Sequence, residues 1–514
     1  KDLYDFGDRL CLNFGHTIGH SIEQHFHYEK YSHGEAVGIG MVAITRIAEL
    51  KGLCEKGTTK RIEDALGHYN LPTQANVPTK ELLKAIDLDK KNINSTLSFV
   101  LLKTIGEVPP SKSLAHRAII CAALAPGMSR ISGIDYSEDI EATIEGMKAL
   151  GAIIKQEGDT LIIDGSITLG LGRVEIDAHE SGSTLRFLMP LSLVNFSRVH
   201  FVGKGKLGQR PLDVYYDIFD KQKIAYLRKD SERLDVILDG QLHSDIFEVP
   251  GNVSSQFISG LLFTLPLLQG DSLIKITTPL ESKGYIDLTL DMLEKFGIEI
   301  INHDYQAFQI RGNQNYKPCD YNVEADFSQA AFYLVADLLG SDITLTNLNM
   351  HSSQGDRAIL DIMEQMGGEI VETSAGIKVV CDKIKPATID ASQCPDLMPV
   401  VSVACGLAEG TSHIINAGRL RIKECDRLTA SVELLKATGI DAVEEEDSMT
   451  ITGSTSYNKA EVTSSNDHRM CMAEAILSTR ANGPITIDDK DCVKKSYPGF
   501  FEDFKSLGGE YHEC

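Results

Sequence analysis

Six short apolar stretches, each opened by polar residues, recur along most of the chain. They cover residues 113–127, 184–194, 255–270, 328–340, 396–410 and 468–483. Their starts are separated by 71, 71, 73, 68 and 72 residues. Because these stretches are apolar on every face, they predict buried helices rather than helices that cover a surface.

A second pattern keeps step with the first. A helix with charge on one face stops at a glycine, and two short strands follow it. Clear copies lie at 147–165, 292–312, 362–380 and 433–453, a weaker copy at 218–240 has Lys223 in place of the glycine, and a shortened copy lies at 504–510. Five near-equal intervals argue against chance similarity. From about residue 112 onward, the chain therefore reads as six repeated units, each with two helices and a small sheet.

Residues 1–108 follow a different pattern and contain six of the fifteen histidines. Helices are predicted around 19–27, 34–51, 59–69 and 79–86, and a strand over 97–102. Pro109 and Pro110 follow directly, without a linker rich in glycine, serine or charge. We therefore expect a separate, mainly helical N-terminal region that ends near residue 108.

Composition excludes several classes of protein. The chain has 514 residues and a net charge of −23, which argues against a nucleic-acid-binding protein. Its eleven cysteines include no C-x-x-C pair, so we expect reduced thiols and a cytoplasmic location. No apolar run is long enough for a membrane helix, and no signal peptide opens the chain. An anionic ligand would have to meet a local basic cluster on this acidic protein.

Several of the predicted buried helices open with residues suited to such a cluster. Lys112 and Ser113 lie in the first turn of one helix, and Arg117 follows on the same face. Free N–H groups at a helix start, together with a lysine and an arginine, favour phosphate or carboxylate. Similar openings occur at 181–186, 252–256 and 466–469. Taken alone, each of these three openings is better explained as an N-cap than as a binding site.

Two further segments mix charges of both signs. Residues 419–427 hold four cations and two carboxylates, and residues 494–498 read Lys-Lys-Ser-Tyr-Pro. Asp396 opens a predicted buried helix, where a carboxylate is either a cap or a general base. In isolation, each segment is also typical of a solvated run of charge.

Taken in order along the chain, these motifs resemble one family. They are Lys112-Ser113-x-x-x-Arg117, Glu180-Ser181-Gly182-Ser183-Thr184-Leu185-Arg186, Gln209-Arg210-Pro211, Val253-Ser254-Ser255-Gln256-Phe257, Ser282-Lys283-x-Tyr285-Ile286-Asp287, Lys423-Glu424-x-Asp426-Arg427, Asn466-Asp467-His468-Arg469-Met470 and Lys495-Ser496-Tyr497-Pro498. The set is similar to that of the 5-enolpyruvylshikimate-3-phosphate synthases (3-phosphoshikimate 1-carboxyvinyltransferases). This resemblance implies an α/β fold of six βαβαββ units in two lobes, here 109–324 and 325–514.

The resemblance also implies a role for individual residues. The shikimate 3-phosphate site would comprise Ser113, Arg117, Ser254, Ser255, Gln256, Ser282, Tyr285, Asp396 and Lys423. The phosphoenolpyruvate clamp would comprise Lys112, Arg210, Arg427, Arg469 and Lys495, with Gly182 near the phosphate. Proton transfer would fall to Lys112, Asp396, Glu424 and Lys495. Glu180 and Phe187 depart from residues that many relatives carry near this site.

The implied chemistry suits these residue types. Several cations must offset the repulsion between two polyanionic substrates, and arginine gives two-pronged contacts to carboxylate and phosphate. No metal or organic cofactor is implied for the transferase, and we expect a monomer without nucleic-acid or membrane partners. Two alternatives stay open: transfer to a UDP-sugar, and an inactive fusion fragment, either a scaffold or a metal-binding remnant.

Residues 1–108 resemble a second family, the C-terminal metal domain of 3-dehydroquinate synthases. Arg9-x-x-x-Asn13-Phe14-Gly15-His16-Thr17-Ile18-Gly19-His20 and His33-Gly34-Glu35-Ala36-Val37 carry the resemblance. It implies His16 and His33 as ligands of an incomplete zinc site, with Arg9, Asn13 and His20 near substrate. The NAD domain and a third ligand of that family lie upstream of the matched region. We therefore expect no lyase activity, and residues 99–102 to substitute for a strand that precedes Pro109 in complete transferases.

Overall fold

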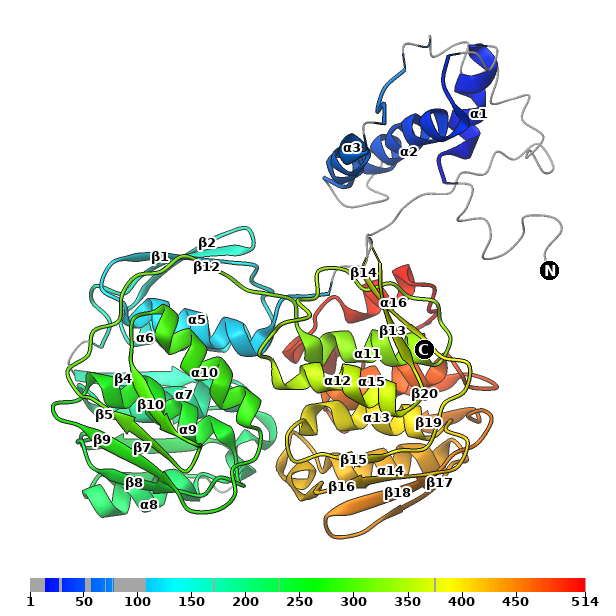
Figure 1. Cartoon of the computed structure of the whole chain (residues 1–514). Coiled ribbons are helices and arrows are strands. Elements are labelled where there is room, and N and C mark those ends of the chain that lie inside the picture. The colour runs from blue at the N-terminus through cyan, green and yellow to red at the C-terminus, as the bar shows by residue number, and fades with distance from the viewer. Residues whose placement is uncertain are drawn as a thin grey trace. The chain divides into compact units, whose positions relative to one another are not determined.

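The computed structural model describes residues 14–26, 30–50, 57–69, 71–75, 77, 108–169, 172–230, 232–373 and 376–513. The chain divides into two compact units. One comprises Lys1–Gly106 with Glu502–Cys514, and the other comprises Glu107–Phe501. Figure 1 shows the helices and strands of each.

The first unit contains three described helices, which are α1 (His16–His25), α2 (His33–Leu50) and α3 (Thr58–His68). They agree with three of the four helices predicted from the sequence. The fourth, over 79–86, and the strand over 97–102 lie outside the described residues. Ile18 and Ile22 on α1 pack with Ile39 and Ile44 on α2 to form a small apolar core. No helix among the described residues is long and apolar enough to cross a membrane.

Six buried helices dominate the second unit and confirm the first sequence pattern. They are α5 (Lys112–Leu124), α7 (Gly182–Ser192), α9 (Ser255–Thr264), α11 (Phe327–Leu338), α13 (Met398–Cys405) and α15 (His468–Ser478). In α11 every residue from Phe327 to Leu338 is buried. A helix buried on all sides needs polar residues only at its ends, which is where the conspicuous serines, lysines and arginines stand.

The amphipathic helices follow in alternation. They are α6 (Glu138–Ala149), α8 (Asp213–Gln222), α10 (Lys283–Lys295), α12 (Ala358–Gln365), α14 (Arg427–Ala437) and α16 (Phe500–Ser506). Gly151 after α6 has a φ of 110°, in the left-handed region that glycine enters without steric cost. Lys223 has a φ of 59° at the end of α8, so the lysine in the weaker copy adopts the same left-handed turn.

Three sheets show the same strand order. They are formed by β4 (Gly172–Asp177), β5 (Phe196–Val202), β6 (Ala225–Arg228) and β7 (Asp235–Asp239); by β8 (Ile246–Val249), β9 (Ser272–Ile276), β10 (Ile300–His303) and β11 (Ala307–Ile310); and by β15 (Thr388–Asp390), β16 (Thr411–Ile415), β17 (Asp441–Glu444) and β18 (Ser448–Thr452). In each, the first two strands are parallel and the last two form an antiparallel hairpin. These are complete βαβαββ units.

The other units vary this plan. β13 (Glu369–Thr373) pairs with β14 (Gly376–Val380), and β19 (Ala460–Val462) pairs in parallel with β20 (Ile485–Ile487). The sheet of β1 (Met128–Ser132), β2 (Ile153–Glu157) and β3 (Thr160–Asp164) is completed by β12 (Tyr321–Asn322), which pairs in parallel with β1. The first strand of the first unit thus comes from far along the chain, and the sequence pattern did not predict it.

Elements α5 to β12 and elements α11 to α15 form two groups that stand side by side in Figure 1; we call them the N-terminal and the C-terminal lobe. Two segments of chain join them and run antiparallel. The Ser111 N–H donates to the Glu324 carbonyl at 2.7 Å, and the Asp326 N–H donates to the Pro109 carbonyl at 2.8 Å. The limits expected for the lobes, 109–324 and 325–514, stay a prediction.

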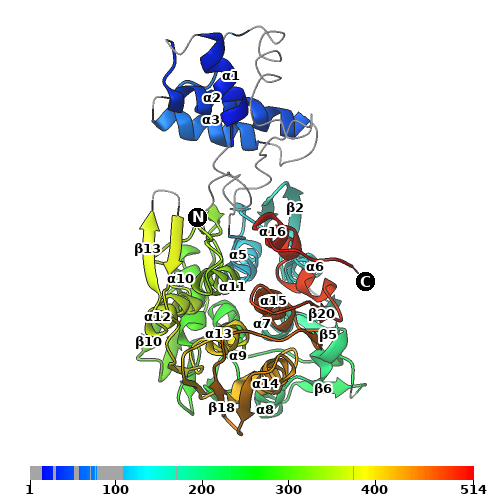
Figure 2. The same ribbon diagram turned by 90° about the vertical axis from the view of Figure 1, so that its right-hand side faces the viewer.

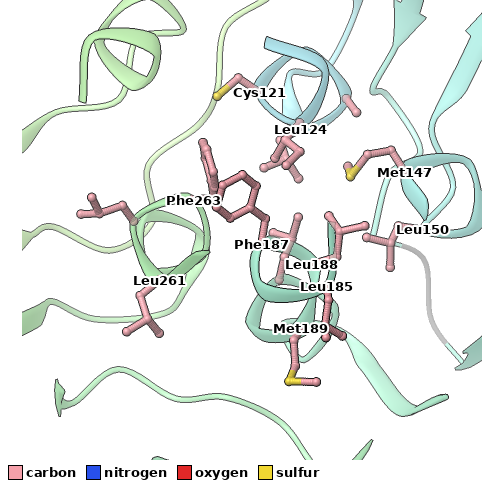
Figure 3. Close-up of a cluster of buried hydrophobic side chains, with 14 of the residues drawn as sticks. Cys121, Leu124, Met147, Leu150, Leu185, Phe187, Leu188, Met189, Leu261 and Phe263 are labelled. Carbon is pink, nitrogen blue, oxygen red and sulfur yellow. The ribbon is translucent and has the colours of Figure 1, made fainter. Parts of the chain in front are cut away.

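Each lobe has a core of buried helices. In the N-terminal lobe, side chains from α5, α6, α7 and α9 pack together, and the rings of Phe187 and Phe263 meet edge to face at 5.4 Å (Figure 3). In the C-terminal lobe, α11, α13 and α15 contact one another (Figure 2). Rigid cores of this kind fix where the helices begin, and therefore where their polar first turns point.

Candidate active site

One pocket lies where the first turns of buried helices from both lobes meet. The N-terminal lobe contributes residues at the starts of α5, α7, α9 and α10. The C-terminal lobe contributes η5 (Pro395–Leu397), η6 (Gly418–Ile422) and the starts of α14 and α15. Its lining comprises Lys112, Ser113, Arg117, Asp139, Gly182, Ser183, Arg186, Phe187, Arg210, Pro211, Val253, Ser254, Ser255, Gln256, Ser282, Tyr285, Asp396, Arg419, Ile422, Lys423, Glu424, Arg427, His468 and Arg469.

Side-chain caps set the direction of these first turns. The Ser181 hydroxyl accepts from the Thr184 N–H at 3.2 Å, and the Ser254 hydroxyl accepts from the Gln256 N–H at 3.3 Å. In the C-terminal lobe, an Asp467 carboxylate oxygen accepts from the Arg469 N–H at 2.9 Å. Each cap begins a helix at the pocket, so the positive ends of several helix dipoles face the same space.

The lining carries a clear excess of positive charge. Eight of its residues are lysine or arginine and three are aspartate or glutamate, on a protein whose net charge is −23. A pocket with this balance, enclosed by two lobes, attracts anions that the rest of the surface repels.

Asp396 is the centre of the ionic network. Its Oδ1 accepts from Lys423 Nζ at 3.0 Å and from Arg427 Nη1 at 2.8 Å, and its Oδ2 accepts from the Tyr285 hydroxyl at 3.1 Å. Arg469 Nη2 lies 3.3 Å from the same Oδ2. Burial raises the pKa of Asp396, but the charges of Arg469, Lys423 and Arg427 outweigh it and hold this pKa well below its usual value. Asp396 is therefore ionised at neutral pH.

Glu424 bridges the two lobes. One carboxylate oxygen lies 2.7 Å from Arg210 Nη2 of the N-terminal lobe, and the other accepts from Arg427 Nη2 at 2.7 Å. Burial raises the pKa of Glu424, but Arg210 and Arg427 together hold it well below the usual value. An anionic ligand that takes these arginines would remove that stabilisation, so the pKa of Glu424 would rise on binding.

Other cations are held in less charged surroundings. Arg117 donates to the Thr289 hydroxyl at 2.9 Å, the Ser113 carbonyl at 2.7 Å and the Tyr285 carbonyl at 2.9 Å. Arg186 donates to Gln256 Oε1 at 2.8 Å. Burial lowers the pKa of Arg117 to about 10 and that of Arg186 to about 9. Among the described residues, neither has a carboxylate within ion-pair distance.

Lys112 and Lys495 are each paired with one carboxylate. Lys112 Nζ donates to Asp139 Oδ2 at 2.8 Å. Lys495 Nζ donates to Glu180 Oε2 at 2.8 Å and to the Asn466 carbonyl at 2.9 Å, and its side chain is 8% exposed. Lys495 is not part of the pocket lining in this structure. Its carboxylate partner, Glu180, lies two residues before Gly182, which does line the pocket.

The structure thus brings together every site residue expected of the transferase except Lys495. Among polar residues, it adds Asp139, Ser183, Arg186, Arg419 and His468 to the lining. Arg186, Arg419 and His468 stand inside the motifs noted in the sequence. Their membership of those motifs could have identified them as site residues. Asp139 had none, because an acidic residue in the first turn of a helix is ordinary.

A second cluster lies in the first unit. His20, Glu23 and His33 each offer a ligand atom, and these atoms lie within 4.8 Å of one another. His33 Nδ1 is 3.2 Å from Glu23 Oε1. The expected pair was His16 and His33. Glu23 was missed, and His16 stays outside the group, although its ring centroid is 5.3 Å from that of His33. Arg9 and Asn13 lie outside the described residues.

Comparison with known proteins agrees with both sequence resemblances. Residues 100–504 match the family described as EPSP synthase (3-phosphoshikimate 1-carboxyvinyltransferase), and residues 1–92 match the 3-dehydroquinate synthase C-terminal domain. A 3-phosphoshikimate 1-carboxyvinyltransferase of Clostridium perfringens is 54% identical over 409 residues, which cover 79% of this chain and 96% of that protein. One from Clostridioides difficile is 52% identical over 419 residues, covering 79% and 95%.

Solved structures support the fold. EPSP synthase from Acinetobacter baumannii superposes with a TM-score of 0.63 at 23% identity, covering 78% of this chain and 95% of that one. The enolpyruvyl transferase NikO from Streptomyces tendae gives a TM-score of 0.64 at 16% identity, covering 80% and 95%. With the pocket, the repeated units and relatives above 50% identity in agreement, this chain belongs to the EPSP synthase family and is an enzyme.

Proposed function

We propose that the pocket transfers the carboxyvinyl group of phosphoenolpyruvate to the 5-hydroxyl of shikimate 3-phosphate. The observation that carries this proposal is the excess of cations that two lobes direct into one pocket. Each of the two substrates carries a phosphate and a carboxylate, and bringing them together requires several fixed positive charges.

The reaction adds and then eliminates. The 5-oxygen bonds to C2 of phosphoenolpyruvate while its proton leaves, and C3 gains a proton to become a methyl group. The tetrahedral adduct then loses phosphate from C2 and a proton from C3, which restores the double bond. No electrons are gained or lost overall, and the products are the enolpyruvyl ether and phosphate.

The ionisation of each residue suggests which proton-transfer step it performs. Asp396 is ionised and is suited to accept the proton of the 5-hydroxyl. Glu424 gains proton affinity when anions take Arg210 and Arg427, so it is suited to deliver and recover the proton at C3. Lys112, at the start of α5, and Lys495 complete the proposed proton-transfer set. Closure of the lobes would exclude water from these steps.

The direct test is an assay of purified chain with shikimate 3-phosphate and phosphoenolpyruvate, without added metal. We expect phosphate to be released only when both substrates are present, at a rate that rises with the concentration of each. A chain that releases none would support the inactive fragment, and release only with a UDP-sugar as acceptor would support that alternative.

Single substitutions test the assigned roles. Asp396→Ala and Lys112→Ala should each lower kcat by about a hundredfold or more, since general acid–base catalysis contributes roughly 10²–10⁴. Lys148→Ala is a matched control, because Lys148 is an exposed lysine on α6 that forms a salt bridge with Glu145 and does not line the pocket. Turnover like that of the unsubstituted protein in both variants would contradict the assignment.

We further propose that His20, Glu23 and His33 bind zinc without giving the first unit a lyase activity. Two imidazoles and a carboxylate are a common zinc ligand set. Titration with zinc should show one site that His33→Ala removes and that His68→Ala, on the exposed end of α3, retains. Dehydroquinate formation with added NAD and zinc should be absent. Any turnover in that assay would contradict this second proposal.

A further inference from the structure

Asp356 is a buried carboxyl group that lies one hydrogen bond away from the pocket. It belongs to η4 (Gly355–Arg357) of the C-terminal lobe, is 2% exposed and does not line the pocket. Its Oδ2 accepts from the Tyr285 hydroxyl of the N-terminal lobe at 3.1 Å and from the Ser328 hydroxyl. Its Oδ1 has no hydrogen-bond partner among the described residues. A buried carboxyl group with an unused oxygen has a place for a proton.

The Tyr285 hydroxyl joins this carboxyl group to Asp396. It lies 3.1 Å from Asp356 Oδ2 and 3.1 Å from Asp396 Oδ2. A phenol carries one hydrogen, so it can donate fully to only one of the two carboxylates at a time. Two buried carboxyl groups that share one donor favour a state in which one of them holds a proton. Tyr285 is therefore placed to pass a proton from one aspartate to the other.

Backbone contact across the lobes holds this arrangement in place. Gly284 precedes Tyr285, Gly355 precedes Asp356, and a Cβ at Gly284 would lie 2.6 Å from Gly355 Cα. Close by, the Ser353 hydroxyl donates to Oδ2 of Asp291 on α10 at 2.8 Å. The start of η4 therefore touches the start of α10 directly, and this contact sets the distance between the phenol and the carboxyl group.

The charges around the two aspartates differ. Asp396 pairs with three cations, which are Lys423, Arg427 and Arg469. These cations disfavour a proton on Asp396. Among the described residues, no lysine or arginine forms an ion pair with Asp356, whose hydrogen-bond partners are two hydroxyls. A proton that can move between the two aspartates therefore rests on Asp356.

The wider surroundings of Asp356 support the same conclusion. The titratable and charged groups that face it are Tyr285 on α10, Asp396 in η5 with Cys394 just before it, Arg469 on α15 and Asp326 just before α11. Burial and the negative charge of Asp396 raise the pKa of Asp356 to about 6, although Arg469 and the Ser328 hydroxyl act in the opposite direction. Asp356 is therefore largely ionised at neutral pH and still takes up a proton more readily than Asp396 does.

We propose that Asp356 stores the proton that Asp396 takes from the 5-hydroxyl, and that it receives this proton through the Tyr285 hydroxyl. Asp396 gives a proton to the Tyr285 oxygen while the Tyr285 hydroxyl gives its own proton to Asp356. Asp396 and Tyr285 then return to their starting states, and Asp356 is neutral. When phosphate leaves C2, the stored proton passes back along the same path and departs with the phosphate. Asp356 touches no substrate and is a positioning residue for this proton, and the inference rests on the proposed function.

Storage at Asp356 favours the forward reaction. The tetrahedral adduct reverts to substrates only if the 5-oxygen regains a proton as its bond to C2 breaks. A proton on Asp396 is available for that step, whereas a proton on Asp356 lies one hydroxyl further away. Removal of the store should therefore make the adduct revert more often before it loses phosphate.

The test compares Asp356→Asn with a matched control, Asp361→Asn, at an exposed site on α12. Both variants and the unsubstituted protein are assayed with shikimate 3-phosphate and phosphoenolpyruvate in deuterium oxide. The acid that protonates C3 then delivers a deuteron, so recovered phosphoenolpyruvate carries deuterium only where an adduct has formed and reverted. Mass spectrometry measures this deuterium per phosphate released. Thermal unfolding establishes that each variant is folded.

We expect Asp356→Asn to lower kcat by about tenfold or more, at the lower end of what proton transfer contributes. The deuterium in recovered phosphoenolpyruvate, per phosphate released, should rise severalfold. The KM values of both substrates should change less than about threefold, because Asp356 touches neither. Asp356→Glu should restore part of kcat, since it keeps a carboxyl group at this position.

Ser328→Ala gives a second measurement and replaces Asp356→Asn if that variant does not fold. Loss of the Ser328 hydroxyl removes a donor to ionised Asp356, so its pKa rises and the store fills at a higher pH. The fall of kcat toward acid pH should therefore move upward by about one pH unit. Substrate phosphates also titrate near pH ~6, so the readout is the difference between the two proteins.

Three results would overturn the inference. They are an Asp356→Asn chain with the kcat of Asp361→Asn, a deuterium ratio that is the same in these two variants, and an acidic fall of kcat that Ser328→Ala does not move. Failure of the proposed function is distinguishable, because the unsubstituted protein would then release no phosphate from the two substrates. The proton store would fall with it.

Discussion

At the scale of single residues, Gly182 shows how the pocket depends on the absence of a side chain. A Cβ at this position would lie 2.6 Å from Arg210 Nη1 and 2.9 Å from Arg186 Nη1. Both atoms are at the ends of flexible side chains, so a methyl group would displace the two guanidiniums rather than the backbone. The glycine therefore allows both guanidiniums to approach an anion bound in the pocket.

Gly182→Ala should raise the KM for phosphoenolpyruvate by about tenfold or more, because a displaced arginine loses a charged hydrogen bond worth about 1.5–3 kcal/mol. The melting temperature should stay within a few degrees of that of the unsubstituted protein. Steady-state kinetics and thermal unfolding give the two readouts. Gly67→Ala, in open space on α3, should change neither. A large fall in melting temperature with an unchanged KM would show that the glycine serves packing instead.

The carboxyl group of Glu474 is buried in an environment that does not stabilise its charged form. It is 0% exposed on α15, and neither of its oxygens has a hydrogen-bond partner among the described residues. Burial, together with the negative charge of Asp488, raises its pKa from 4.5 to about 9. The folded protein therefore holds a proton on Glu474 that the unfolded chain has released, at any pH between these two values.

The sign of the resulting pH dependence follows directly. Between pH 4.5 and about 9 the folded state binds more protons at this site, so its stability falls as pH rises, by up to about 1.4 kcal/mol per pH unit. Glu474→Gln removes this dependence, so its melting temperature relative to the unsubstituted protein should climb steadily from pH 5 to 9. Glu433→Gln, at an exposed site on α14, should give a flat difference. A flat difference for Glu474→Gln as well would mean that the carboxyl is solvated.

Residue identities in the site were readable from the sequence because the motifs occur in a fixed order. Lys112, Arg210 and Arg427 lie far apart along the chain yet face one pocket. The carboxylates that pair with Lys112 and Lys495 were not predicted as their partners. Asp139 pairs with Lys112, and Glu180 pairs with Lys495, through contacts that depend on how helices pack, and no local spacing encodes that.

At the scale of elements, hydrophobic periodicity located all six buried helices, since an all-round apolar stretch has few alternatives in a globular chain. It also located the hairpins that follow the amphipathic helices. It missed β12, a two-residue strand that pairs with β1 although 190 residues separate Ile131 from Tyr321. A strand this short has no period of its own, and its existence depends on the sheet edge that it meets.

At the scale of the whole molecule, the two segments that join the lobes also position residues of the pocket. Asp326 caps α11 by accepting from the Ser328 N–H at 2.7 Å. Its second oxygen accepts from the backbone N–H of Lys112 at 3.0 Å, at the start of α5 in the other lobe. One buried carboxylate thus orients the first turns of two helices, one in each lobe, and fixes the backbone of a residue assigned to proton transfer.

Asp326→Ala should therefore impair turnover as well as stability. Loss of a cap costs about 0.5–2 kcal/mol, so the melting temperature should fall by a few degrees. We expect kcat to fall about tenfold or more, because Lys112 loses the contact that positions it, and a misplacement of about 1 Å can cost two orders of magnitude in rate. Asp326→Asn, which keeps an accepting oxygen, should lie between the two.

Ser137→Ala separates the two effects. Ser137 stands at the N-cap of α6 but makes no side-chain cap hydrogen bond, so its loss should leave both kcat and the melting temperature close to those of the unsubstituted protein. If Asp326→Ala lowers the melting temperature while kcat is retained, Asp326 is a helix cap alone. If kcat falls as expected, the crossing between the lobes does more than connect them, because it also positions the start of α5, with Lys112, at the pocket.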